Sequence, residues 1–274
     1  MDPIQEQFAQ RLKEHGITLE PSQLEQFEIY FKELVEWNEK MNLTGITERE
    51  QVYTKHFYDS ISLAFYVNMG EIGTLADIGS GAGFPGIPLK ICFPHLKLTI
   101  IDSLNKRISF LQHIVQETGL KDVELLHGRA EDWGRKAGYR DHFDLVTARA
   151  VARQAVLNEF CLPFVKVNGL FAAMKGSDPA EEVQEAAKSL KELRGKVIEV
   201  ERFLLPVEES ARHIVQIRKT APTPGKYPRK AGTAVKSPLV IKKLVSASCI
   251  RLYGMCSRLT SYQRTVWNQV IFIK

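Results

Sequence analysis

Residues 74–88 read Thr-Leu-Ala-Asp-Ile-Gly-Ser-Gly-Ala-Gly-Phe-Pro-Gly-Ile-Pro, and this stretch decides the fold of the chain. A short apolar run ends at Asp77, a loop with four glycines follows, and the apolar residues 87–93 predict a helix. Glycines at alternate positions carry no Cβ, so the backbone can turn sharply and a ligand can lie directly on it. A strand, a glycine loop and a helix in this order are typical of nucleotide-like cofactor sites at the edge of a parallel sheet.

The spacing of the glycines bears on the class of cofactor. Dinucleotide enzymes use G-x-G-x-x-G to seat a pyrophosphate on a helix N-terminus, whereas here the pattern is G-x-G-x-G and Phe84-Pro85 follows. The bulk of Phe84 falls where a pyrophosphate needs bare backbone N–H groups, which favours a cofactor without phosphates, such as S-adenosylmethionine. The next apolar run, 96–101, ends at Asp102, whose carboxylate can accept both ribose hydroxyls in either cofactor class.

Composition indicates an ordinary globular protein of the reducing cytosol. The chain has 274 residues, of which 44% are hydrophobic and 25% charged, and no apolar stretch approaches membrane-spanning length. Its start lacks the basic and apolar regions of a secretory signal. The cysteines, at positions 92, 161, 249 and 256, have neither metal nor disulfide spacing. We therefore expect a cytoplasmic protein with no bound metal and no membrane partner.

The charges are distributed unevenly along the chain. Glu209 is the last acidic residue, and thirteen Lys or Arg follow it, so the net charge of +5 leaves −8 for residues 1–209. A basic C-terminal arm on an acidic body is typical of nucleic-acid contact, although a solvated tail without a partner has the same charge pattern.

The hydrophobic pattern divides the chain into helical, alternating and irregular parts. Residues 1–70 read as a helical cap whose second helix buries Leu24, Phe27, Phe31, Leu34 and Val35, with capping boxes at Ser22…Glu25 and Thr47…Glu50. Residues 71–219 alternate strands with helices, which predicts a doubly wound α/β domain. Strands are expected at 74–78, 96–101, 122–127, 143–148, 169–174, 197–204 and 213–218, and helices at 104–118, 151–162 and 178–194. No full helix separates the last two strands, so they are expected to be antiparallel. Residues 220–239 predict an extended basic arm.

Together these motifs resemble the RsmG (GidB) family of S-adenosylmethionine-dependent methyltransferases, which modify N7 of a guanine in 16S ribosomal RNA. The resemblance runs from near the start of the chain to about Leu239. It is carried by Trp37-Asn38, Asn42-Leu-Thr44, His56-Phe-Tyr-Asp59-Ser60, Asp77–Gly86, Asp102-Ser103, Lys106-Arg107, Phe110-Leu111, Arg129-Ala-Glu131, Thr147–Val151, Lys175-Gly176 and Lys226-Tyr-Pro-Arg229-Lys230.

The resemblance implies a fold, a reaction and a set of site residues. The fold would be the Rossmann-like sheet of class I methyltransferases with an antiparallel last strand. The partner would be 16S RNA or a small-subunit particle. Gly79, Gly81, Gly83 and Phe84 would form the cofactor pocket, Asp102 with Ser103 would hold the ribose, and Ala130-Glu131 the adenine edge. Arg149 would stand between cofactor and base as the catalytic residue.

Seven further cations are expected at the RNA. Lys106 and Arg107 begin a helix, where the dipole disfavours cations unless an external anion is present. The others are Arg153, Lys175, Lys226, Arg229 and Lys230. His56, Asp59 and Ser60 are interpreted either as a substrate-side network or as a buried histidine with its partners, and Trp37, Asn38 and Asn42 as packing between cap and domain.

The sequence leaves two other functions open, and its last residues depart from the family pattern. A nicotinamide dehydrogenase is disfavoured by the third glycine and by Phe84, and a catalytically idle RNA-binding assembly factor would retain every motif. Residues 240–274 match nothing in the family pattern and are interpreted as a non-native extension or an added basic tail.

Overall fold

The computed structural model describes residues 2–241 of the chain. Residues Met1–Val240 form one compact unit. The tail predicted for 240–274 therefore lies, from residue 242 onward, outside the described residues.

A seven-stranded sheet forms the centre of this unit, in the order β3-β2-β1-β4-β5-β7-β6. Strands β1 to β5 pair in parallel, whereas β7 pairs antiparallel with both β5 and β6, which confirms the expected antiparallel end of the sheet. All seven predicted strands are present. Their bounds are β1 Thr74–Ile78, β2 Lys97–Asp102, β3 Val123–His127, β4 Phe143–Arg149, β5 Val165–Lys175, β6 Gly195–Leu204 and β7 Ala211–Lys219.

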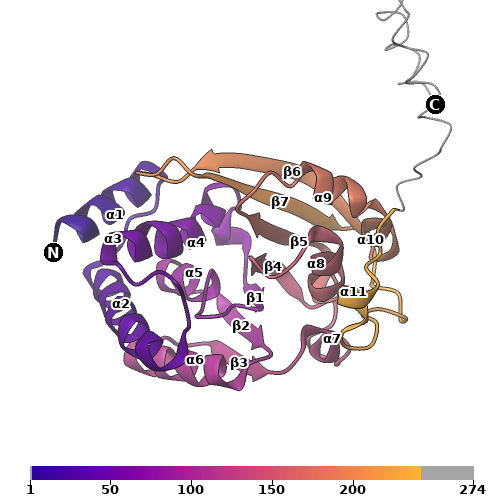
Figure 1. Cartoon of the computed structure of the whole chain (residues 1–274), viewed down its shortest axis with the longest axis horizontal. Helices are drawn as coiled ribbons and strands as arrows, with labels where there is room; N and C mark the ends of the chain where they lie inside the picture. The colour runs from indigo at the N-terminus through magenta and orange to yellow at the C-terminus, as the bar shows by residue number, and fades with distance from the viewer. Residues whose placement is uncertain (1, 242–274) are drawn as a thin grey trace, which may run out of the picture. The chain divides into compact units, whose positions relative to one another are not determined.

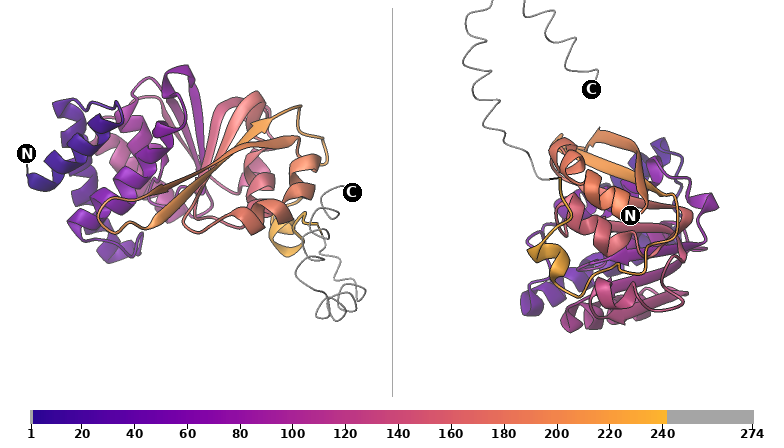
Figure 2. Two further views of the ribbon diagram at one scale, coloured as in Figure 1. Left: turned by 90° about the horizontal axis from the view of Figure 1, so that it is seen from above. Right: turned by 90° about the vertical axis from the view of Figure 1, so that its right-hand side faces the viewer.

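Helices cover both faces of the sheet (Figures 1 and 2). One face is covered by α5 (Gly86–Cys92) and α6 (Asn105–Glu117), with the N-terminal helices outside them. The other face is covered by α7 (Ala130–Trp133), α8 (Gln154–Cys161), α9 (Ala180–Glu185) and α10 (Ala187–Glu192). The single helix expected over 178–194 is thus two short helices that meet at Ala186. None of the helices in residues 2–241 has the length and apolar character needed to cross a membrane.

The N-terminal helical segments are α1 (Pro3–Glu14), α2 (Pro21–Met41), α3 (Arg49–Gln51), the π-helix η1 (Val52–Tyr58), α4 (Asp59–Ile61) and two 3₁₀ turns, η2 (Ser62–Phe65) and η3 (Met69–Glu71). Both predicted capping boxes are wrong. Proline favours the first helical position, so Pro21 shifts the cap back to Glu20, whose N–H donates to Gln23 Oε1 at 2.7 Å. The later helix is capped by Glu48, whose carboxylate accepts from the N–H groups of residues 50 and 51.

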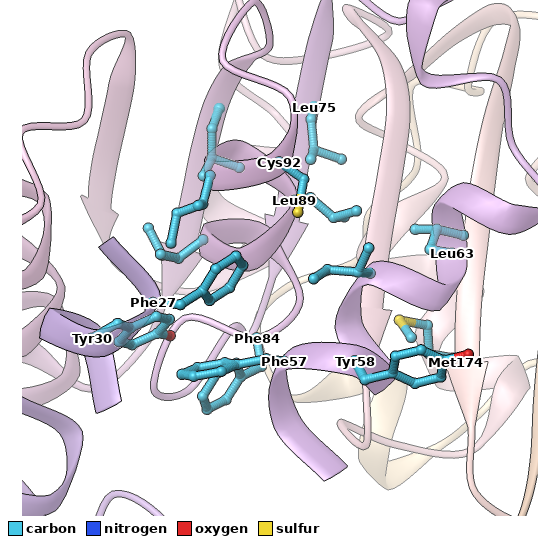
Figure 3. Packing of buried hydrophobic residues seen from close by; sticks show 14 of the residues in the cluster. Phe27, Tyr30, Phe57, Tyr58, Leu63, Leu75, Phe84, Leu89, Cys92 and Met174 are labelled. Carbon is cyan, nitrogen blue, oxygen red and sulfur yellow. The ribbon is translucent and has the colours of Figure 1, made fainter. Parts of the chain in front are cut away.

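The N-terminal helices share one hydrophobic core with the glycine loop. In α2 the fully buried residues are Phe27, Tyr30 and Leu34; Tyr30 is missing from the predicted stripe, and Leu24, Phe31 and Val35 are only half-buried. Figure 3 shows the ring of Tyr30 beside Phe84, with Phe57 next to them. A second core lies on the other face of the sheet, around Phe164 and Phe171.

The segment after β7 has little regular structure. Its only helix among the described residues is α11 (Thr233–Lys236). Arg140 holds the segment by donating to the carbonyls of Thr223, Pro224 and Tyr227, and buried Lys219 donates to Thr223 Oγ1 at 2.5 Å.

Candidate functional site

The chain reverses its winding direction between β1 and β4, which are neighbours in the sheet. In open parallel sheets a crevice forms at this point, beyond the carboxyl ends of the strands. The glycine loop follows β1 at that edge, Asp102 ends β2, and Arg149 ends β4. The structure therefore brings the principal predicted site residues to one edge of the sheet.

Asp77 fixes the shape of the glycine loop from below. Its side chain is fully buried, and Oδ2 accepts from Ser80 Oγ at 2.6 Å and from the N–H of Gly86 at 2.8 Å. Burial raises the pKa of this carboxyl to about 6, because the charged form loses its hydration. The other oxygen, Oδ1, is buried and has no hydrogen-bond partner within residues 2–241.

The three predicted glycines differ in what surrounds them. All have positive φ angles, +72° at Gly79, +65° at Gly81 and +103° at Gly83. A Cβ at Gly79 would lie 3.0 Å from a methyl of Val151, and one at Gly83 would lie 2.5 Å from Tyr30 Oη. A Cβ at Gly81 would meet nothing within 4 Å. Of these three glycines, only Gly81 has space for a Cβ among the described residues.

Phe84 lies in the core rather than along an open wall. Its ring is 5% exposed and is stacked between Tyr30 and His56, with centroid distances of 5.4 and 4.6 Å. The Arg149 guanidinium lies 4.9 Å from the ring centroid. Phe84 thus connects the glycine loop to the N-terminal helices and to Arg149.

Asp102 orders the start of the next helix. Its buried carboxylate accepts from the N–H groups of Gly81 at 3.0 Å and Leu104 at 2.9 Å, and from Arg107 Nη1 at 3.3 Å. Arg107 is therefore paired with this acid. Ser103 is exposed, and Lys106 donates to the carbonyl of Met41 at 2.9 Å.

The predicted adenine edge lies at the start of α7. Ala130 is half-buried, whereas Glu131 is 4% exposed and accepts from the N–H of Gly232 at 2.8 Å. Gly232 belongs to the segment after β7, so that segment covers part of this edge. Nothing in the residue pattern predicts this contact.

Arg149 is held by a buried carboxylate. Its Nη1 donates to Asp59 Oδ2 at 2.9 Å, and to the carbonyls of Lys55 at 3.3 Å and His56 at 3.5 Å. Asp59 also lies 3.3 Å from Arg212 Nε, through Oδ1. One carboxylate from the N-terminal helices thus joins the ends of β4 and β7.

His56 is half-buried beside this ion pair and stacks on Phe84. Burial, assisted by the charge of Arg149, lowers the pKa of its imidazole to about 3. Its Nε2 lies 2.8 Å from Thr44 Oγ1. His56 and Asp59 both lie beside Arg149, and Asp59 forms the ion pair with it.

A cleft of about 310 Å³ lies beside this ion-paired group. Sequence reasoning had named Arg149, Lys175, His56 and Asp59 from its lining. It missed the residues that β6 and β7 contribute, because the sequence does not show that β7 lies between β5 and β6. The complete lining is Lys55, His56, Asp59, Arg149, Ala150, Met174, Lys175, Gly176, Phe203, Arg212 and His213.

Two of the remaining predicted RNA-contacting cations are at least partly buried, and three are exposed. Lys175 is buried and pairs with Glu182 at 2.8 Å, and Arg229 grips the buried carboxylate of Glu159 through Nε and Nη2. Arg153, Lys226 and Lys230 are exposed; Arg153 pairs with Glu185 and Lys226 with Glu192. Trp37 packs on Phe110 and His113, as expected for contact between cap and domain.

No group of three or more His, Cys, Asp or Glu side chains suited to a metal ion occurs within the described range 2–241. Both cysteines in that range, Cys92 and Cys161, are buried, and burial raises the pKa of each thiol.

Comparisons with known proteins agree closely with one another. A family model described as rRNA small subunit methyltransferase G (GidB) matches residues 23–215. A ribosomal RNA small subunit methyltransferase G from Brevibacillus brevis is 60% identical over 235 residues, which cover 86% of this chain and 99% of the relative. The corresponding protein of Bacillus pumilus is 58% identical over 234 residues, 85% of this chain and 98% of the relative. A solved structure from Klebsiella pneumoniae, provisionally described as an O-methyltransferase, matches with a TM-score of 0.50 and 14% identity over 79% of this chain and 99% of that chain. That likeness concerns the fold alone.

Proposed function

The chain belongs to the rRNA small subunit methyltransferase G (GidB) family, and from that premise we propose that it transfers a methyl group from S-adenosylmethionine to N7 of a guanine in 16S ribosomal RNA. The observation that carries this proposal is the family match across residues 23–215, which includes the glycine loop and Arg149. The seven-stranded sheet with its antiparallel end is the class I methyltransferase fold.

The residues of the loop fit the proposed cofactor. Gly81 offers backbone beside open space, and Asp77 Oδ1 is a buried acceptor without a donor among residues 2–241, which a cationic amino group would satisfy. Asp102 stands at the end of β2, where a carboxylate can hold a ribose. Gly79, Gly83 and Phe84 would shape the loop rather than touch the cofactor with side chains, and Ser103 and Ala130-Glu131 would complete the adenosine side. When bound, S-adenosylmethionine supplies a methyl group activated by its sulfonium.

Guanine N7 is a lone pair that carries no proton, so the acceptor needs no general base. The protein then contributes alignment and exclusion of water. This role suits a site whose histidine, His56, is half-buried, stacked on Phe84 and held neutral by its lowered pKa. Arg149, fixed by Asp59 and Phe84, would orient the base or the cofactor carboxylate from a rigid position.

The RNA would lie across the cationic rim of the site. Lys106, Arg153, Lys226 and Lys230 are exposed and can reach phosphates, although Arg153 and Lys226 also pair with acids at the surface. Arg107, Lys175 and Arg229 are at least partly buried, and each pairs with a carboxylate. We assign the exposed group to RNA and the second group mainly to holding the fold. The partner would be free 16S RNA or a small-subunit particle in the cytoplasm.

Transfer of a tritiated methyl group tests the proposal. The full chain is incubated with labelled S-adenosylmethionine and with 16S RNA or small-subunit particles, and mild alkali then cleaves the strand at any N7-methylated guanine. Label at a single guanine supports the proposal. Calorimetry with S-adenosylmethionine and with NAD runs alongside. Cofactor binding without label would leave the idle assembly factor, and NAD binding alone would leave the dehydrogenase.

A further inference from the structure

The cleft beside Arg149 carries more positive charge than its surroundings neutralise. Lys55 pairs with Glu208 at 2.6 Å and Lys175 pairs with Glu182 at 2.8 Å, both acids lying outside the lining. Arg149 and Arg212 share the single carboxylate of Asp59, at 2.9 and 3.3 Å. Two guanidinium charges therefore face one carboxylate charge, so the half-buried cleft has a net charge of one cation.

The two arginines also have donors to spare. Arg149 uses Nη1 for Asp59 and two backbone carbonyls. Arg212 uses Nη1 for Ser210 Oγ at 3.3 Å and the Ala211 carbonyl at 3.0 Å, and its Nε faces Asp59. Nothing within residues 2–241 accepts from Nη2 of either guanidinium. Such a planar pair of free N–H groups is suited to an anionic oxygen.

His213 supplies a second, independent indication of a ligand. The residue lines the same cleft and is only 7% exposed, and its Nδ1 is buried without a hydrogen-bond partner among residues 2–241. A buried polar atom without a partner costs free energy unless something else supplies the bond. Phe203 and Met174 give the lining an apolar part, so the cleft offers a nucleoside contact area as well as cations.

We propose that this cleft seats the acceptor nucleotide and that Arg212 and His213, from β7, hold the phosphate of the target guanosine. The inference rests on the proposed function and names residues for it that the sequence did not single out. The cleft includes Arg149 at the end of β4, next to the strand that carries the glycine loop. A phosphate bound there would anchor the guanosine at the same crevice as the cofactor loop.

Binding of guanosine 5′-monophosphate and of guanosine to the full chain tests this assignment. Chemical-shift titration should show that the wild-type chain prefers the monophosphate. Arg212→Gln should weaken monophosphate binding by at least about tenfold and leave guanosine unchanged, because a charge-assisted contact is lost. Arg218→Gln is the matched control, since Arg218 lies on the same strand, is exposed and donates to the Asn168 carbonyl instead.

Two further variants guard against loss of folding, because Arg212 also pairs with Asp59. Arg212→Lys keeps the charge and should restore part of the monophosphate preference, and His213→Phe keeps the ring and should reduce it. With 16S RNA as substrate, Arg212→Gln should raise KM more than it lowers kcat and should reduce the salt dependence of binding by about one phosphate contact.

The outcomes separate this inference from the proposed function. Equal binding of monophosphate and guanosine, or equal effects of Arg212→Gln and Arg218→Gln, would overturn the phosphate assignment even if the wild-type chain methylates 16S RNA. A monophosphate preference that depends on Arg212, in a chain that transfers no methyl group, would keep the nucleotide cleft and remove the methyltransferase proposal.

Discussion

Alanine at position 83 should destabilise the chain much more than alanine at position 81, although both residues are glycines of one loop. Both positions have positive φ, so each alanine would have to adopt a left-handed backbone conformation, which costs about 1–2 kcal/mol. The Gly81 Cβ would enter open space. The Gly83 Cβ would lie 2.5 Å from Tyr30 Oη and 2.9 Å from both Ile87 and Leu111, all of which are buried.

The difference can be given a magnitude from these contacts. Overpacking a filled core costs typically about 1–3 kcal/mol. The displaced Tyr30 hydroxyl also loses its hydrogen bond to the Ala82 carbonyl, at 2.5 Å, for about 1 kcal/mol more. Gly83→Ala should therefore lower the free energy of unfolding by about 3–6 kcal/mol, against about 1–2 kcal/mol for Gly81→Ala.

Equilibrium denaturation in urea, followed by circular dichroism, measures both values on the full chain. Calorimetry with S-adenosylmethionine gives the complementary readout, because Gly81→Ala fills the space assigned to the cofactor and should weaken its binding while the fold persists. If the two variants unfolded at the same urea concentration, the close packing of α2 against the loop would be refuted.

Three other perturbations have outcomes that follow from burial and pairing. The pKa of the His56 imidazole is lowered, so its contribution to the free energy of unfolding is complete above pH 6.5 and is lost as the pH falls toward 3, by up to about 5 kcal/mol. His56→Gln should therefore flatten the acid side of the plot of stability against pH. An unchanged plot would show that the imidazole is hydrated. Arg229→Ala leaves the buried Glu159 carboxylate unpaired and should lower the free energy of unfolding, measured by thermal denaturation, by about 3–5 kcal/mol. Lys230→Ala should lower it by less than about 0.5 kcal/mol. Similar losses in the two variants would mean that the Arg229–Glu159 pair is solvated. Arg149→Ala should reduce methyl transfer more than cofactor affinity, measured by the labelled assay and calorimetry, and unaltered turnover would make that arginine purely structural.

The strands and the glycine loop could be predicted because their signals are local. Buried parallel strands read as short apolar runs, and glycines with positive φ mark the loop after β1 directly. Capping was less predictable, since Pro21 and Glu48 shifted helix starts by a residue or two from the Ser and Thr that looked suitable. Such boundaries depend on competition between neighbouring caps.

Contacts between distant segments could not be predicted from the sequence. The insertion of β7 between β5 and β6 brings Arg212 and His213 to the cleft, and a hairpin pattern is equally compatible with either strand next to β5. Arg229 looked like part of an RNA-binding arm because a charge pattern does not reveal a buried acid such as Glu159, 70 residues earlier. The sequence shows the charge of a side chain directly, but it does not show which distant side chain pairs with that charge.

The hydrogen bond from the Tyr30 hydroxyl to the carbonyl of Ala82 makes the structure of the glycine loop depend on the first forty residues. A gene shortened at its 5′ end, starting translation after α2, would still encode every glycine, Asp102 and Arg149. Its product would lack Tyr30, one of the two rings between which Phe84 is stacked, and the loop would form without that contact. In a survey of random mutants, changes at Tyr30 should therefore cluster with changes in the loop itself, far from it in the sequence but alike in phenotype.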